Sequence, residues 1–218
     1  MKKLIAMFVI LILLAAGFLG YQGYERSQQT GLFADASVYF EEQDYQKAIQ
    51  LFEEAKEHHS LFSGSLEEEF SYYQAEAYMN LEEYDKAIAI YDEYIKENEK
   101  ESMNYVLKGY CYMQAKEYDQ AVDVYKTAYE KTKDGEFLLN LCNVYITTEE
   151  YDQALSLISK HQDLEDEDTV RQLLFSEIAI YEKQQDYSTA YEKAKAYVES
   201  YPDDADGIKE MEFLESRQ

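Results

Sequence analysis

The sequence is poor in the residues that form tight turns, since its 218 residues include one proline and eight glycines. A protein made of many short strands needs such residues at its hairpins, so this scarcity argues against an all-β fold. Tryptophan is absent, whereas 23 residues are tyrosine. The hydrophobic fraction of 46% argues against disorder. The composition therefore predicts a folded protein made of helices.

Positive charge is also scarce, because 20 Lys and Arg residues stand against 45 Asp and Glu, a net charge of -25. So acidic a surface repels nucleic-acid phosphates and anionic lipid headgroups. We expect no nucleic-acid partner, and a protein partner whose binding segment is basic or apolar. The alternative is that the charge serves solubility alone.

Residues with metal-binding or redox chemistry are few. Cys111 and Cys142 could pair in an oxidising compartment, but their positions do not coincide in the repeat described below. We therefore favour two small buried residues over a disulfide. The adjacent His58 and His59 are expected to be solvated loop residues.

No catalytic motif is present in the sequence, neither a nucleophile elbow nor a phosphate-binding loop nor a zinc signature. The acidic stretch at residues 163–169 lacks the Gly-centred loop and distal Glu of a calcium site and is expected to be a solvated linker and helix start. The stretch at residues 203–207 resembles the middle of an EF-hand loop, but its first and twelfth ligand positions would be Pro202 and Phe213, so the match fails. We predict that the protein is not an enzyme and has no catalytic residues, no cofactor and no metal site. An enzyme or a calcium-binding module is the third functional hypothesis, after the scaffold and the accessory factor described at the end of this subsection.

The N-terminus carries a membrane signal, "LIAMFVILILLAAGFLGY", with no charge inside it. As a helix this stretch is about 27 Å long, close to the hydrocarbon core of a bilayer. Lys2 and Lys3 precede it, which favours a cytoplasmic N-terminus. We predict a cytoplasmic segment at residues 1–3, a single-pass anchor at 4–22 and a juxtamembrane linker at 23–29, with the remainder extracytoplasmic. The alternative is a signal peptide cleaved near residues 15–17, which would release a secreted protein.

A repeated segment fills the rest of the chain, recurring about every 35 residues, the spacing of stacked helical hairpins. Each copy has an alanine that follows a tyrosine by three positions and another tyrosine by nine. The alanines are Ala48, Ala87, Ala121, Ala154 and Ala190; the tyrosines nine before them are Tyr39, Tyr78, Tyr112, Tyr145 and Tyr181; those three before are Tyr45, Tyr84, Tyr118, Tyr151 and Tyr187. We expect these columns to be structural.

A third column, twelve positions before each alanine, is mostly small: Ala36, Ala75, Gly109, Cys142 and Ile178. Small residues let two helices cross closely. Polar stretches such as "EEQD" and "TTEE" separate the helices, and their acidic residues suit the start of the second helix.

These columns resemble the tetratricopeptide repeat over residues 30–202, although the family's Trp position carries Leu32, Ser71, Tyr105, Leu138 and Leu174. The resemblance implies an all-α fold, a right-handed α-solenoid of about five hairpins. We expect a capping helix at 203–218 to cover the last hairpin with Ile208, Met211, Phe213 and Leu214. The transmembrane helix would precede the hairpins.

The resemblance also implies that the first helix of each hairpin lines a concave face. The predicted peptide-binding groove consists of Tyr72, Met79, Val106, Tyr110, Met113, Leu139, Asn143, Ile146 and Phe175. Met and aromatic side chains suit an adaptable groove for a peptide or a helix. The alternative is that these side chains only pack against neighbouring helices.

The sequence thus predicts a non-catalytic scaffold or adaptor, displayed outside the cytoplasmic membrane, that binds a peptide or helix of a partner. The alternative function is an accessory factor of protein secretion or envelope assembly that receives translocated chains. The lipid bilayer is an expected partner through the N-terminal helix, and the sequence gives no indication of the oligomeric state.

Overall fold

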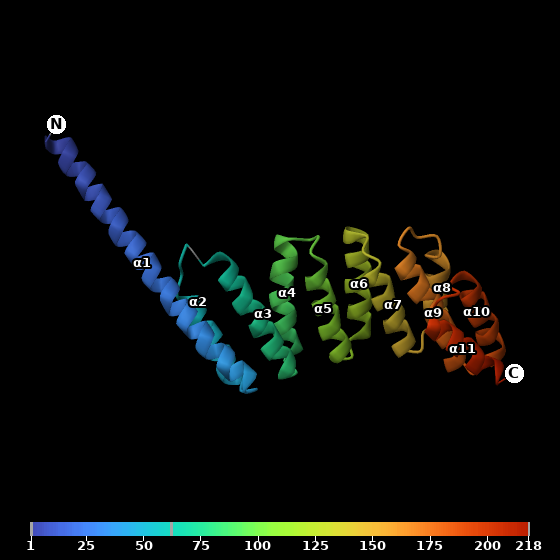
Figure 1. Cartoon of the computed structure of the whole chain (residues 1–218). Coiled ribbons are helices and arrows are strands. Elements are labelled where there is room, and N and C mark those ends of the chain that lie inside the picture. The colour runs from blue at the N-terminus through green and yellow to red at the C-terminus, as the bar shows by residue number, and fades with distance from the viewer. Residues whose placement is uncertain (1, 62, 218) are drawn as a thin grey trace. The chain divides into compact units, whose positions relative to one another are not determined.

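The computed structural model describes residues 2–61 and 63–217, and all regular secondary structure within these ranges is helical (Figure 1). The helices are α1 (Lys2–Glu41), α2 (Tyr45–Glu57), α3 (Gly64–Asn80), α4 (Tyr84–Glu97), α5 (Ser102–Gln114), α6 (Tyr118–Thr132), α7 (Glu136–Thr147), α8 (Tyr151–Lys160), α9 (Glu167–Lys183), α10 (Tyr187–Ser200) and α11 (Ala205–Glu215). Met1, Phe62, Gln218 and the side chains of residues 2–6 and of Ser65 lie outside this description, so the expected role of Lys2 and Lys3 stays a prediction.

The helices form two compact units, Met1–Glu93 and Tyr94–Gln218. In the first unit α1 packs on α2, and α2 on α3. In the second, α5 packs on α6, α7 on α8, and α9 on α10, and α11 lies on α10. The predicted all-α class, the helical hairpins, the C-terminal helix and the long apolar N-terminal helix are confirmed.

The alanine column and the small column of the repeat lie in the core, whereas most tyrosines of the other two columns are half-buried. All five anchoring alanines have no exposed surface, and the small column is buried as well. Cys111 and Cys142 are free thiols, so the prediction of buried cysteines is confirmed. Burial raises the pKa of Cys111 to about 12 and that of Cys142 to about 11, which makes both thiols unreactive near neutral pH.

The turn inside each hairpin has one conformation throughout. The residue five positions before each anchoring alanine has a positive φ near 60°, and none of these residues is glycine: Gln43, Glu82, Lys116, Glu149 and Gln185. The next residue donates its backbone N–H to the carbonyl of the tyrosine nine positions before the alanine, as from Asp44 to Tyr39 at 2.9 Å and from Glu150 to Tyr145 at 2.7 Å. These bonds satisfy carbonyls that the helix end would leave without a partner.

Helix α1 combines the apolar stretch with the first helix of the first hairpin. Its side chains from Met7 to Tyr21 are exposed, and it is long and apolar enough to cross a membrane. The expected juxtamembrane linker at 23–29 is helical and continuous with both neighbours. Buried positions begin at Gln22, immediately after the apolar stretch.

Two sequence predictions about single side chains are wrong. His58 lies in a loop, as expected, but it is half-buried rather than solvated, because its Nδ1 lies 2.8 Å from Oε2 of the buried Glu25; His59 is exposed, as expected. Phe213 does not cover the last hairpin, because it is 44% exposed and its ring lies 4.4 Å from the Arg217 guanidinium. Its neighbour Leu214 is fully buried, and adjacent residues on a helix point about 100° apart.

Candidate peptide-binding site

Helix α7 has a core face and an open face. Leu138, Leu141 and Cys142 are buried in the hydrophobic core of the second unit. Leu139, Asn143 and Ile146 are spaced by four and three positions and therefore share the other face. Leu139 and Ile146 are half-buried and Asn143 is exposed, so this face offers apolar surface beside a polar group.

A cavity of about 340 Å³ opens between α7, α9 and the start of α11. Its lining residues are Leu139, Asn143, Ile146, Arg171, Gln172, Phe175, Ser176, Tyr197, Asp204 and Asp206. Phe175 lies one turn after Arg171 on α9, and its ring meets the Tyr197 ring edge-on with centroids 5.5 Å apart. Leu139, Ile146 and Phe175 form the apolar part of the lining.

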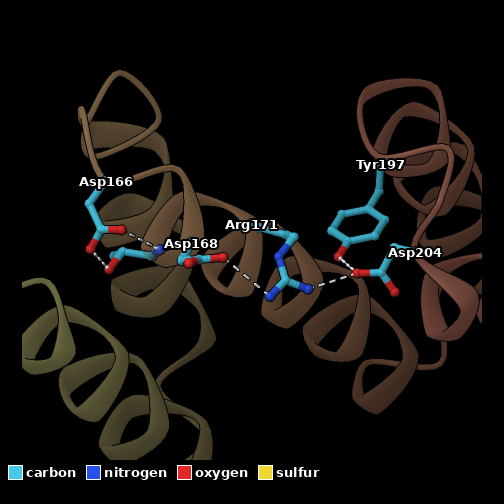
Figure 2. Close-up of polar contacts among 6 residues, drawn as sticks. Asp166, Asp168, Arg171, Tyr197 and Asp204 are labelled. Carbon is cyan, nitrogen blue, oxygen red and sulfur yellow. Dashed lines mark hydrogen bonds and ion pairs between the residues drawn. The ribbon is translucent and has the colours of Figure 1, made fainter.

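Three residues of the lining, Arg171, Tyr197 and Asp204, belong to a polar network (Figure 2). Arg171 Nη1 donates to Asp204 Oδ2 at 2.8 Å, and Arg171 Nη2 lies 3.5 Å from Asp168 Oδ1. The Tyr197 hydroxyl donates to the same Asp204 oxygen at 2.7 Å. Asp204 caps α11, because its Oδ1 accepts the backbone N–H of Asp206 and of Gly207, each at 3.1 Å. One carboxylate thus joins α9, α10 and α11.

The network holds its charges over a wide pH range. Hydrogen bonds from Tyr197, from the backbone of Gly207 and from Arg171 lower the pKa of Asp204 to about 2. Burial, followed by the bond to Asp204, raises the pKa of Tyr197 to about 12. The hydrogen bond to Asp204 also raises the pKa of the Arg171 guanidinium. The bridge between α9 and α11 is therefore intact at physiological pH.

Gly207 lets α11 approach α10. A Cβ atom at this position would collide with the Tyr197 ring, so any other residue would push the two helices apart. Tyr197 is 3% exposed, with its ring against Phe175 and its hydroxyl on Asp204. The packing of Tyr197 and Asp204 therefore bounds the cavity at the turn between α10 and α11.

The structure brings four of the nine predicted groove residues to this cavity, namely Leu139, Asn143, Ile146 and Phe175. Val106 and Met113 on α5 are half-buried and pack against the core cluster around Tyr125. Tyr110 on the same helix is 46% exposed.

Tyr72 and Met79 lie on α3 in the first unit, where both are half-buried. The Tyr91 hydroxyl contacts the Met79 sulfur at 3.4 Å. Packing within a hairpin thus accounts for much of the Met79 surface, whereas the residues around α7 line a cavity.

Sequence reasoning missed Arg171, Tyr197, Asp204 and Asp206. Arg171 could have been found, because it lies one helical turn before Phe175 on the face that the groove prediction used. For Asp204, the sequence indicates only that an acidic residue stands before a helix. Its bond to Arg171 depends on the packing of α11, which no local pattern encodes.

The described residues contain no group of three or more His, Cys, Asp or Glu side chains placed to hold a metal ion. The cavity instead offers apolar surface beside carboxylates. Asp204 is held by four hydrogen bonds, while Asp206 is exposed at the rim and its Oδ1 lies 3.2 Å from Lys209 Nζ. This arrangement suits an apolar side chain that is followed by a donor or a cation.

Comparisons with known proteins agree with the fold. The family model described as "Anaphase-promoting complex, cyclosome, subunit 3" matches residues 60–128, and the model described as "Tetratricopeptide repeat" matches residues 112–174. No curated protein is a significant sequence match.

Several solved structures have similar folds. A tetratricopeptide repeat protein from Parabacteroides merdae ATCC 43184 has a TM-score of 0.60 at 14% identity, covering 86% of this chain and 72% of its own. MamA from Desulfovibrio magneticus RS-1 has a TM-score of 0.54 at 18% identity, covering 82% of this chain and 98% of its own. YrrB, described as a TPR protein with an unusual peptide-binding site, has a TM-score of 0.50 at 14% identity, and the match covers 82% of this chain and 89% of YrrB. At such identities the likeness concerns the fold.

Proposed function

Because this chain belongs to the tetratricopeptide repeat family, we propose that it is a non-catalytic scaffold that binds a segment of a protein partner. The observation that carries the proposal is the cavity between α7, α9 and α11, whose apolar lining is accessible beside a fixed polar network. Family membership alone defines packing and leaves the ligand open.

The partner segment binds through one apolar side chain and a flanking basic residue. The apolar side chain enters between Leu139, Ile146 and Phe175, where it loses contact with water. The basic residue lies near the exposed carboxylates of Asp168 and Asp206. The net charge of -25 attracts such a segment over a longer range. YrrB, a protein of similar fold, is described as having a peptide-binding site.

The scaffold is displayed on the outer side of the cytoplasmic membrane. Helix α1 supplies a stretch that is long and apolar enough to span the bilayer. Lys2 and Lys3 before it, and the acidic repeats after it, favour a cytoplasmic N-terminus. Protease added to spheroplasts is expected to digest the repeats, and their complete protection would contradict this orientation.

Substitution of Ile146 tests the cavity. Peptides are first selected from a random library against the wild-type chain, and the selected sequences are expected to combine apolar residues with Lys or Arg. Ile146→Glu places a charge among apolar groups and should weaken binding by about tenfold or more, which corresponds to about 1.4 kcal/mol.

Met103→Glu is the matched control, because Met103 lies on α5 in the same unit, is 55% exposed and is not part of the cavity lining. Circular dichroism should show that both variants keep the helix content of the wild type. Equal affinities of the wild type and Ile146→Glu would move the binding site elsewhere.

A second candidate function, an accessory of secretion or envelope assembly, has one observation in its favour. Helix α1 runs without a break from the apolar stretch into the first hairpin, which holds that hairpin beside the membrane. Photo-crosslinking in cells from position 143 separates the two functions. Many translocated clients would support the accessory function, and one stable partner would support the scaffold.

A further inference from the structure

The part of α1 that follows the apolar stretch has a buried polar stripe. Gln22, Glu25 and Gln29 are 6%, 8% and 0% exposed, respectively. Their spacing of three and four places them on one face of the helix. Buried polar side chains require hydrogen-bond partners, so this face must be covered by a polar segment.

That segment follows α2, and its residues His58, Ser60 and Leu61 contact α1. The backbone N–H of Leu61 donates to Gln22 Oε1 at 2.6 Å, and the Ser60 hydroxyl donates to the Gln22 carbonyl at 3.1 Å. The Ser63 hydroxyl bonds Gln29 Oε1. Together these contacts hold the segment at the level of Gln22.

Glu25 strengthens the same attachment. Hydrogen bonds, first from Tyr21 and then from His58, lower the pKa of the Glu25 carboxyl, so it is ionised at neutral pH. The His58 ring lies 2.8 Å from that carboxylate.

The segment exposes a large apolar side chain at this level. Leu61 is 76% exposed, the highest value among the large apolar side chains in the part of the chain that the structure describes. Gln22 is the last residue of the expected span, so Leu61 lies where the hydrocarbon core ends. Tyr21 and Tyr24 are 57% and 58% exposed on the adjoining turn of α1. Tyrosines are typical of the membrane–water interface.

We propose that residues 58–61, which follow α2, form a second membrane contact, in which Leu61 enters the interfacial layer of the bilayer that α1 spans. The proposal rests on the membrane anchoring of the proposed function. The headgroup layer is roughly 5–7 Å deep on each side, so a side chain held beside Gln22 reaches it. Two points of contact fix the rotation of the first hairpin relative to the membrane.

The contact is apolar and does not depend on lipid charge. Leu61 itself is uncharged, and of the nearby basic groups His58 is bound to Glu25 and Lys56 Nζ donates to Gln74 Oε1 at 2.6 Å. Binding of Leu61 is therefore expected to be similar in zwitterionic vesicles and in vesicles with anionic lipid.

Fluorescence quenching on the full chain tests this contact. Leu61→Cys is labelled with an environment-sensitive fluorophore, and the buried Cys111 and Cys142 stay unlabelled. The chain is reconstituted into phosphatidylcholine vesicles that contain a spin-labelled lipid. Glu42→Cys is the matched control, because Glu42 lies at the far end of α1, about 30 Å along the helix from Gln22.

The label at position 61 should be quenched by the spin-labelled lipid at least about twofold more than the label at position 42. Gln22→Ala should reduce the quenching at position 61, because it removes the acceptor that holds Leu61. Gln28→Ala, at a half-buried position on the same helix, should leave it unchanged.

Vesicle flotation separates failure of this proposal from failure of the proposed function. A chain that floats with vesicles while the label at position 61 stays exposed to water would overturn the second contact. If Gln22→Ala left the quenching at position 61 unchanged, that result would also overturn the second contact. A chain that does not float would refute the anchor, and with it the membrane display and the second contact, while peptide binding in the cavity would be unaffected.

Discussion

At the scale of residues, the hairpins are held by pairs of side chains whose sizes complement each other. The residue twelve before each anchoring alanine and the residue four after it are Ala36 with Phe52, Ala75 with Tyr91, Gly109 with Tyr125, Cys142 with Ile158, and Ile178 with Ala194. A Cβ at Gly109 would collide with the Tyr125 ring, so the smallest partner is matched to a large one. In the fifth hairpin the order is reversed, because the first helix supplies the large residue, Ile178, and the second helix supplies the small one, Ala194. Dense packing conserves the volume of the pair, whichever helix supplies it.

Exchange of the fifth pair tests this rule. Ile178→Ala should cost about 2–5 kcal/mol through the cavity that it leaves, and Ala194→Ile about 1–3 kcal/mol through overpacking. Both residues lie in one buried cluster, so the double variant should be more stable than the sum of the single changes predicts. Urea unfolding of all four proteins measures this coupling, and strictly additive losses would contradict the rule.

Asp204 should make stability depend on pH in a narrow window. Its pKa is about 2 in the folded protein and 3.8 in its ordinary state, so protonation favours the unfolded chain. The stabilisation is fully present above about pH 4 and is lost as the pH falls towards about 2. In Asp204→Asn this part of the pH dependence should disappear, as measured by thermal melting.

Asp206→Asn is the control for the Asp204 prediction, because it removes a carboxylate of the same turn that does not bond Arg171. It should keep the pH dependence of the wild type. Parallel pH curves for the wild type and Asp204→Asn would show that ionisation of Asp204 adds no stability.

At the scale of elements, the second helix of each hairpin begins at an acidic residue, but these residues cap the helix in different ways. The Asp44 and Asp186 side chains accept the backbone N–H three residues on, at 3.2 and 3.1 Å. Glu117 and Glu150 hold the same position and make no such bond with their side chains. The glutamate side chain is one methylene longer, so its carboxylate does not accept the backbone N–H of the first turn. Its negative charge still interacts favourably with the helix dipole.

Exchange of the capping residues should change stability in opposite directions. Asp186→Ala is expected to cost about 1 kcal/mol, because the Thr189 N–H loses its acceptor. Glu150→Asp should stabilise the protein by roughly 0.5 kcal/mol, because the shorter side chain can accept that bond. Urea midpoints measure both effects, and a destabilised Glu150→Asp would show that the longer side chain is needed there.

At the scale of the whole molecule, the last helix serves both the core and the cavity. Leu214 is fully buried in the cluster of Ile178, Ala190, Ala194 and Tyr197. Asp204, at the start of the same helix, holds Arg171 beside the cavity. A terminal repeat needs a cover for its stacking face, and here the cover also supplies a side of the candidate site.

Truncation before Asp203 should therefore affect stability and binding together. Loss of the Leu214 contacts should lower the melting temperature by roughly 5 °C or more. Affinity for selected peptides should fall as well, because Asp204 and Asp206 are removed. Leu214→Ala separates the two effects, since it should lower stability and leave the cavity lining in place. An unchanged melting temperature after truncation would contradict the capping role of α11.

The candidate site was only partly predictable. Leu139, Asn143, Ile146 and Phe175 follow from periodicity, because the face of a helix is a local property of the chain. The bond between Arg171 and Asp204 depends on how α11 packs, and the two residues are 33 positions apart. Spacing along one helix carries no information about such a partner.

The helical class, the hairpin repeat, the buried columns and the apolar N-terminal stretch can be read from the sequence, because each is a local pattern along the chain. Which side chains of different elements meet depends on the fold. Asp204 binds Arg171 beside the cavity, and Phe213 is exposed. His58 pairs with Glu25, and Leu61 lies beside Gln22. These contacts join separate elements, and their geometry is set by how those elements pack.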